Sequence, residues 1–70
     1  MDRKSVESSN ISSIGYDTNN NILEVEFKNG DVYQYFNVPE SEYKGIMEAD
    51  SHGKYLNSNI KKNNYSYQKI

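Results

Sequence analysis

The feature that most constrains the fold of this chain is a short segment in which apolar and charged residues alternate. In ILEVEFK, residues 22–28, an apolar residue is followed by a charged one three times in a row, from Leu23 to Lys28. Side chains of a β-strand point to two faces in turn, so the spacing predicts a strand with one buried and one solvated face. Asn29 and Gly30 follow, a pair typical of hairpin turns. We therefore expect a returning strand over residues 31–38.

The hairpin turn decides which face of the sheet Tyr33 and Tyr35 take. If residues 29–30 form a two-residue loop, both rings lie on the outer face among the glutamates of the preceding strand. If residues 28–29 are the centre of a type I turn and Gly30 forms a left-handed bulge, the register slips by one and both rings join the apolar face. A slip of one residue exchanges every side chain between faces, so the two arrangements exclude each other.

The remaining segments predict an α+β domain. We expect a strand over residues 11–17, before the hairpin. Pro39 ends the hairpin, and apolar residues at helical spacing then predict a helix over 39–49. Ser51 is suited to cap a second helix that ends near residue 62, and residues 65–70 are a possible short C-terminal strand. The expected architecture is a three-stranded antiparallel β-meander followed by two short helices that cover one face.

The length of 70 residues is enough for one domain. Residues 1–9 lack periodicity, so we expect a flexible N-terminal segment followed by a single domain over residues 10–70. The chain has no cysteine, which excludes disulfides and thiolate metal sites. The N-terminus lacks a signal-peptide pattern and no apolar run approaches the roughly 18 residues of a membrane span, so we expect a cytoplasmic protein without a membrane partner.

Charge is distributed unevenly along the chain. Residues 1–50 hold all ten acids and four cations, whereas residues 51–70 hold four lysines and no acid. A basic C-terminal third indicates an anionic partner, unless it packs near the acidic sheet of its own chain. Tyrosines are interleaved there with Lys61 and Lys62, which is the chemistry of single-stranded nucleic-acid binding, where rings stack on bases and lysines meet phosphates. The alternative is that these tyrosines fill a small core.

The residues for catalysis are few. His52 is the one histidine, and its neighbours Asp50 and Ser51 cannot line up with it as orienter and nucleophile. We therefore expect no enzymatic activity, no metal and no cofactor. In the same stretch, Ser51, Gly53 and Lys54 would bring backbone amides, a small residue and a cation to the start of a helix, where a phosphate can bind. A plain helix cap is the alternative explanation.

The order of these motifs resembles the KTSC domain, a short module at the C-terminus of some lysyl-tRNA synthetases that also occurs as a free-standing bacterial or phage protein. The most specific pieces are YQY followed by VP within residues 33–39 and the S-x-G-K-Y-x-N stretch at 51–57. The resemblance covers residues 8–68. It implies an α+β fold without catalytic residues, and RNA binding is suggested by attachment to a synthetase. The resemblance favours the bulged turn, because YQY is the family's central signature and the helices need a wide apolar sheet face on which to pack.

These observations lead us to expect a small non-catalytic binding module for single-stranded RNA or another phosphate-bearing ligand. The alternative is a protein-interaction module that docks on a larger partner or self-associates, with an edge strand such as 11–16 or 65–70 available for β-augmentation. The candidate ligand-binding residues are Tyr33, Tyr35, Ser51, Gly53, Lys54, Tyr55, Asn57, Lys61 and Lys62.

Overall fold

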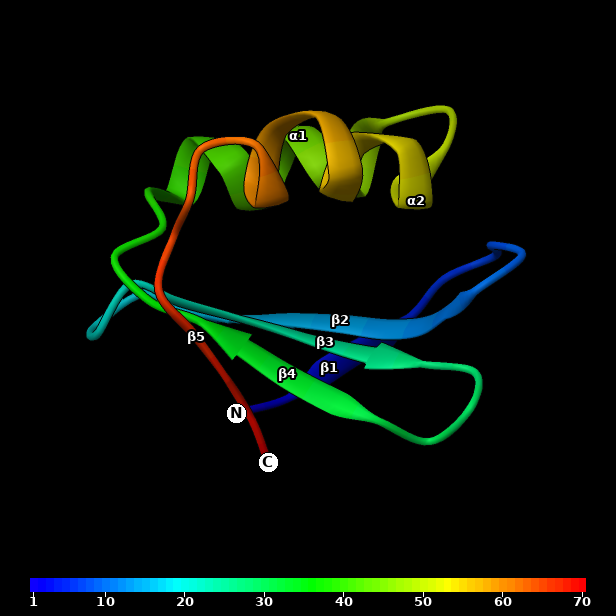
Figure 1. Ribbon diagram of the computed structural model, residues 1–70, viewed down its shortest axis with the longest axis horizontal. Coiled ribbons are helices and arrows are strands. Elements are labelled where there is room, and N and C mark those ends of the chain that lie inside the picture. The colour runs from blue at the N-terminus through cyan, green and yellow to red at the C-terminus, as the bar shows by residue number, and fades with distance from the viewer.

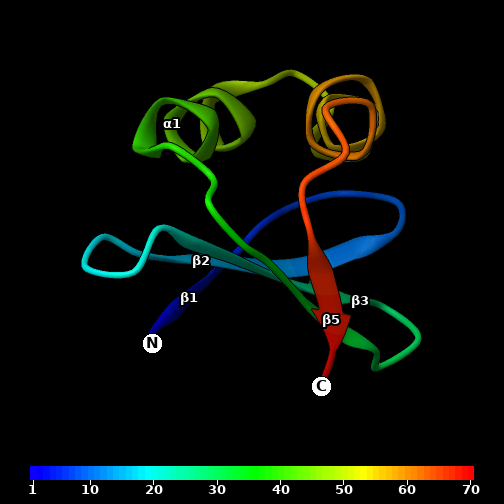
Figure 2. The ribbon, with the colours of Figure 1, turned by 60° about the vertical axis from the view of Figure 1, so that its left-hand side comes forward.

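The computed structural model describes residues 1–70 as a five-stranded antiparallel sheet with one layer of helices (Figure 1). The strands pair in chain order, the helices follow β4 and precede β5 in the sequence, and they form a layer over one face of the sheet (Figure 2). No helix has the length and hydropathy needed to cross a membrane. The elements are β1 (Arg3–Ser5), β2 (Ile11–Asp17), β3 (Ile22–Phe27), β4 (Val32–Tyr35), α1 (Glu40–Glu48), α2 (His52–Tyr55), the π-helix η1 (Leu56–Lys61) and β5 (Tyr67–Lys69).

The sheet is larger than the sequence pattern predicts. The α+β class is confirmed, and the possible C-terminal strand is formed as β5, which pairs with β4. The expected meander of three strands is too small, because β1 lies within the N-terminal segment that we expected to be flexible and pairs with β2. Gly15 permits this pairing, since a Cβ there would lie 2.6 Å from the carbonyl oxygen of Asp2.

Arg3 ties strand β1 to the face of the sheet that the helices leave uncovered. Its guanidinium forms an ion pair with Glu24, and its Nε donates to the hydroxyl of Ser13 at 3.0 Å. The amide of Gln34 donates to the other oxygen of Glu24 at 2.8 Å. Only 7% of Glu24 is exposed, so these partners are needed to offset the cost of burying its charge.

The β3–β4 hairpin adopts the bulged register, as the resemblance favoured. The N–H of Phe27 donates to the carbonyl of Asp31 at 2.8 Å, and Gly30 takes a left-handed φ of 96°. Tyr33 and Tyr35 therefore lie opposite apolar residues of β3. Both rings are on the face of the sheet that the helices cover, and the two-residue loop is excluded.

The core lies between this face and the helices. The helix expected after Ser51 begins as α2 and continues as the wider π-helix η1. Ser51 caps it as predicted, because its hydroxyl accepts from the N–H of Lys54 at 3.2 Å. The buried core residues come from three strands, the helices α1 and η1, and the β4–α1 connection: Ile11, Ile14, Leu23, Val25, Tyr35, Val38, Ile46, Leu56 and Ile60.

Candidate ligand-binding cleft

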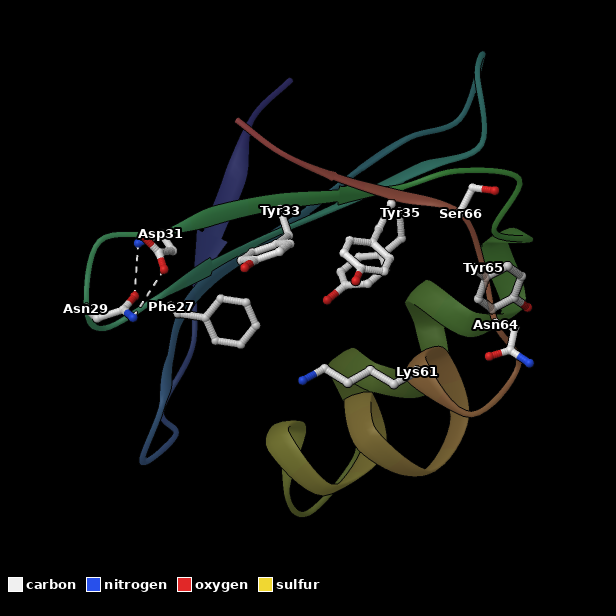
Figure 3. A pocket seen from close by; sticks show the side chains of 10 residues that line it. Phe27, Asn29, Asp31, Tyr33, Tyr35, Lys61, Asn64, Tyr65 and Ser66 are labelled. Carbon is white, nitrogen blue, oxygen red and sulfur yellow. Dashed lines mark hydrogen bonds between the residues drawn. The ribbon is translucent and has the colours of Figure 1, made fainter.

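A cleft of about 810 Å³ lies between the hairpin end of the sheet and the end of η1 (Figure 3). This volume is in the range of small-molecule binding sites. One side is formed by β4, β5 and the hairpin, and the other by the last residue of η1 and the segment that leads to β5. The lining residues are Phe27, Asn29, Asp31, Tyr33, Tyr35, Lys61, Asn64, Tyr65, Ser66 and Tyr67.

Four rings form an aromatic cluster on the sheet side of the cleft: Phe27, Tyr33, Tyr35 and Tyr67. The β4 rings point the same way because they are two residues apart, and Tyr67 lies opposite Tyr35 in the neighbouring strand. The centroid of Tyr67 is 5.9 Å from those of both β4 rings, and Phe27 meets Tyr33 edge to face at 5.7 Å. These distances are typical of favourable aromatic pairs.

The aromatic cluster has a buried part and an exposed part. Tyr35 is 3% exposed, and burial, together with the neighbouring Tyr33 and Tyr67, raises the pKa of its hydroxyl to about 12. Tyr67 is 66% exposed. Ligand contact with the exposed rings therefore does not require the core to open.

Two charged side chains line the cleft. Lys61 is exposed at the end of η1 and makes no ion pair, and Figure 3 shows its side chain extending along the cleft opposite the aromatic cluster. Asp31 lies at the hairpin and pairs with Lys69, with 3.3 Å between Nζ and Oδ1. The cleft thus offers ring faces, a free ammonium group and one carboxylate. No group of three or more His, Cys, Asp or Glu side chains is arranged to hold a metal ion.

Three of the predicted ligand-binding residues meet in the cleft: Tyr33, Tyr35 and Lys61. Lys54, Asn57 and Lys62 are exposed but do not line it. The other three, Ser51, Gly53 and Tyr55, make structural contacts at α2 and also lie outside the cleft.

These structural contacts join the helices to each other and to the N-terminal loop. A Cβ at Gly53 would lie 2.8 Å from Oδ1 of Asn10, so the missing side chain permits close packing. The hydroxyl of Tyr55 donates to Glu42 at 2.6 Å, and this hydrogen bond raises the pKa of Tyr55 to about 12. Tyr55 also packs over Gly45, where a Cβ would be 2.2 Å from its hydroxyl oxygen.

Seven lining residues were not among the predicted site residues. The alternation of Tyr65 and Tyr67 indicated a strand, but only the pairing of β5 with β4 places Tyr67 beside Tyr33. That pairing joins segments more than thirty residues apart, so no local pattern contains it. The missed residues are Phe27, Asn29, Asp31, Asn64, Tyr65, Ser66 and Tyr67.

The fold and the cleft define a small α+β domain with one helical layer and an aromatic cleft at the end of its sheet. A family model described as the KTSC domain matches residues 7–65, so the chain belongs to the KTSC family. The crystal structure of a KTSC domain protein from Yersinia pestis is similar, with a TM-score of 0.90 and 41% identity over 99% of this chain and 96% of that one.

Two sequence relatives differ in size. An uncharacterized protein of Stutzerimonas stutzeri is 41% identical over 70 residues, which is 100% of this chain and 99% of that protein. A lysine–tRNA ligase of Nostoc punctiforme is 38% identical over 55 residues, 79% of this chain but 10% of the ligase. The module is therefore similar both to a protein of its own size and to a small part of a larger enzyme.

Proposed function

We propose that this chain is a non-catalytic module that binds single-stranded RNA in the aromatic cleft. The observation that carries the proposal is the aromatic cluster facing Lys61 across a ligand-sized space. Bases of single strands stack on tyrosine and phenylalanine rings, and a lysine without an ion-pair partner is free to meet the phosphate that joins two bases. In this proposal the exposed rings of the cluster hold the bases and Lys61 holds the backbone.

The similarity to a lysine–tRNA ligase supports RNA over other phosphate-bearing ligands. The ligase contains a segment that 79% of this chain matches, and its name gives an RNA as its substrate. A module of this kind can add RNA contacts without taking part in the reaction. We therefore assign the cleft an RNA-holding role rather than a chemical one.

The distribution of charge allows an acidic chain to bind RNA at this place. The net charge is −2, but Glu24 and Glu26 alternate with the apolar residues of β3 and face away from the helices and the cleft. Within the cleft the carboxylate of Asp31 is paired with Lys69, which leaves Lys61 uncompensated. With few cations in reach, we expect modest affinity and a shallow dependence on salt.

The two neighbouring lysines at the end of η1 provide a matched test. Lys61→Ala is expected to weaken binding of a short, labelled, mixed-sequence RNA several-fold at low salt, because it removes the cleft's free ammonium group. It should also reduce the slope of log affinity against log salt by about 0.7, the value for one phosphate contact on a single strand. Lys62→Ala removes the same charge outside the cleft and should have a smaller effect. Fluorescence anisotropy over a salt series measures both quantities.

Three results of this experiment would contradict the proposal. Absence of binding by the wild type at low salt would rule out RNA as the ligand. Equal losses in the Lys61 and Lys62 variants would place binding outside the cleft. Tyr67→Ala removes an exposed ring and should cost roughly ten-fold in affinity with the salt slope unchanged, so unaltered affinity would exclude stacking on the cluster.

Self-association through strand β5 is a second candidate function. β5 is an edge strand, and Tyr67 within it and Ile70 directly after it are 66% and 58% exposed. Unpaired edges of this kind accept a further strand. Residues 11–17 do not offer such an edge, contrary to our expectation for segment 11–16, because β2 lies between β1 and β3.

Light scattering at micromolar concentration tests this second candidate. Self-association predicts a particle of about twice the chain mass of 8.1 kDa. Ile70 donates its N–H to Val32, so by strand alternation the N–H of Lys69 points outward. Lys69→Pro removes that outward donor and should shift the particle to the monomer mass. A wild-type chain that is monomeric throughout the concentration series would contradict self-association.

A further inference from the structure

Asp31 is the only acidic side chain that lines the cleft, and its main chain is held on both sides. Its carbonyl accepts from the N–H of Phe27 at 2.8 Å, and its own N–H donates to Oδ1 of Asn29 at 3.0 Å. Both bonds belong to the bulged turn at Gly30. The carboxylate is therefore presented to the cleft by a fixed piece of backbone rather than by a free loop.

The position of Asp31 relative to the rings is set by strand alternation. Asp31, Tyr33 and Tyr35 are successive alternate residues, and alternate residues of a strand are roughly 6.7 Å apart on one face. Phe27 lies next to the same point, because it pairs with Asp31 and meets Tyr33 edge to face. A flat ligand that contacts Tyr33 from the cleft would therefore lie within about one two-residue strand repeat of the Asp31 carboxylate.

The Asp31 carboxylate has capacity for a further donor. The ammonium of Lys69 lies 3.3 Å from Oδ1, and the amide of Asn29 donates to Oδ2 at 3.3 Å. Each carboxylate oxygen has two lone-pair sites, so one site on each remains. An ionised carboxylate only accepts, and the ammonium of Lys61 only donates. A ligand that satisfies both must present N–H groups toward the hairpin and acceptor oxygens toward η1.

We propose that the cleft selects RNA bases bearing an exocyclic amino group, cytosine over uracil, and that Asp31 is the residue that discriminates. Cytosine presents an N4 amino donor where uracil presents an O4 acceptor, and aspartate is a known type of acceptor for that amino group. Against uracil, two acceptors would face each other. This inference rests on the proposed RNA binding and adds the class of base to it.

Matched oligonucleotides and matched variants test the inference. Short labelled oligocytidine and oligouridine differ at the position that Asp31 is proposed to contact, and the wild type should bind oligocytidine at least about five-fold more tightly. Asp31→Asn keeps the size of the side chain but adds a donor, so the preference should fall below about two-fold, with stronger binding of oligouridine. Asp50→Asn removes the same charge from an exposed position outside the cleft and should keep the wild-type preference.

The outcomes separate the two proposals. If neither oligonucleotide binds to the wild type, the proposed function and this inference both fail. If both bind equally well, RNA binding stands and base selection by Asp31 is wrong. A preference for oligocytidine that persists in Asp31→Asn would also overturn the inference. Far-ultraviolet circular dichroism of each variant shows whether the fold is intact, and Asp31→Ser gives a second neutral variant if the asparagine variant is unfolded.

Discussion

Replacing Leu56 with alanine is expected to leave a large fraction of the protein unfolded at physiological temperature. Leu56 is the first residue of η1 and is 1% exposed. It is one of the few helical residues whose side chains belong to the buried core between the helices and the sheet. Truncating a buried leucine to alanine costs about 2–5 kcal/mol, through lost burial and the cavity that remains. A single core in a domain of this size rarely supplies more than about 3–5 kcal/mol. Urea titration followed by circular dichroism measures the loss.

Asn57 provides the matched control for this substitution. It follows Leu56 in the same helix but is exposed, so Asn57→Ala should change the free energy of unfolding by less than about 0.5 kcal/mol. A loss below about 1 kcal/mol in Leu56→Ala would mean that η1 does not pack on the sheet as described. The comparison separates packing from helix propensity, because both substitutions introduce alanine.

The parts of the fold that local patterns contain were predictable from the sequence. Alternation in residues 22–28 gave strand β3, and Ser51 marked the start of a helix that its hydroxyl does cap. Strand β1 was not predicted because its three residues are all exposed and show no apolar alternation. Its formation depends on contacts with residues that are distant in the sequence. Arg3 reaches Glu24, and Gly15 leaves room for the backbone. Neither contact produces a periodic signal near residue 3.

The candidate site was predictable only where it follows from one hairpin. Tyr33 and Tyr35 could be placed on a common face, and the choice of face depended on the conformation of Gly30. Tyr67 and Lys61 join the site only because the chain returns from η1 to pair with the edge of β4. The path of that return is set by the packing of the helical layer on the sheet. The residues around Ser51 fitted a phosphate site as well as a helix cap, because helix caps and anion sites use the same residue types.

High pH is expected to destabilise the fold through the buried ring of the aromatic cluster. Burial raises the pKa of Tyr35 to about 12, from about 10 in an unfolded chain, so the folded state holds this proton more tightly. The resulting stability is fully present below pH 10 and is lost as the pH rises from 10 to 12. The loss from this one group is about 2–3 kcal/mol, comparable with the loss expected for Leu56→Ala.

Tyr35→Phe tests whether this ring causes the alkaline transition. The hydroxyl makes no hydrogen bond within the protein, so phenylalanine should preserve the packing while removing the titrating group. The variant should lose less stability between pH 10 and 12, and Tyr67→Phe, which alters an exposed ring of the same cluster, should behave as the wild type. The pKa of Tyr55 is also raised to about 12, by its hydrogen bond to Glu42, so part of the alkaline transition should remain in this variant. An alkaline transition unchanged in Tyr35→Phe would show that ionisation of this hydroxyl does not cause the loss of stability.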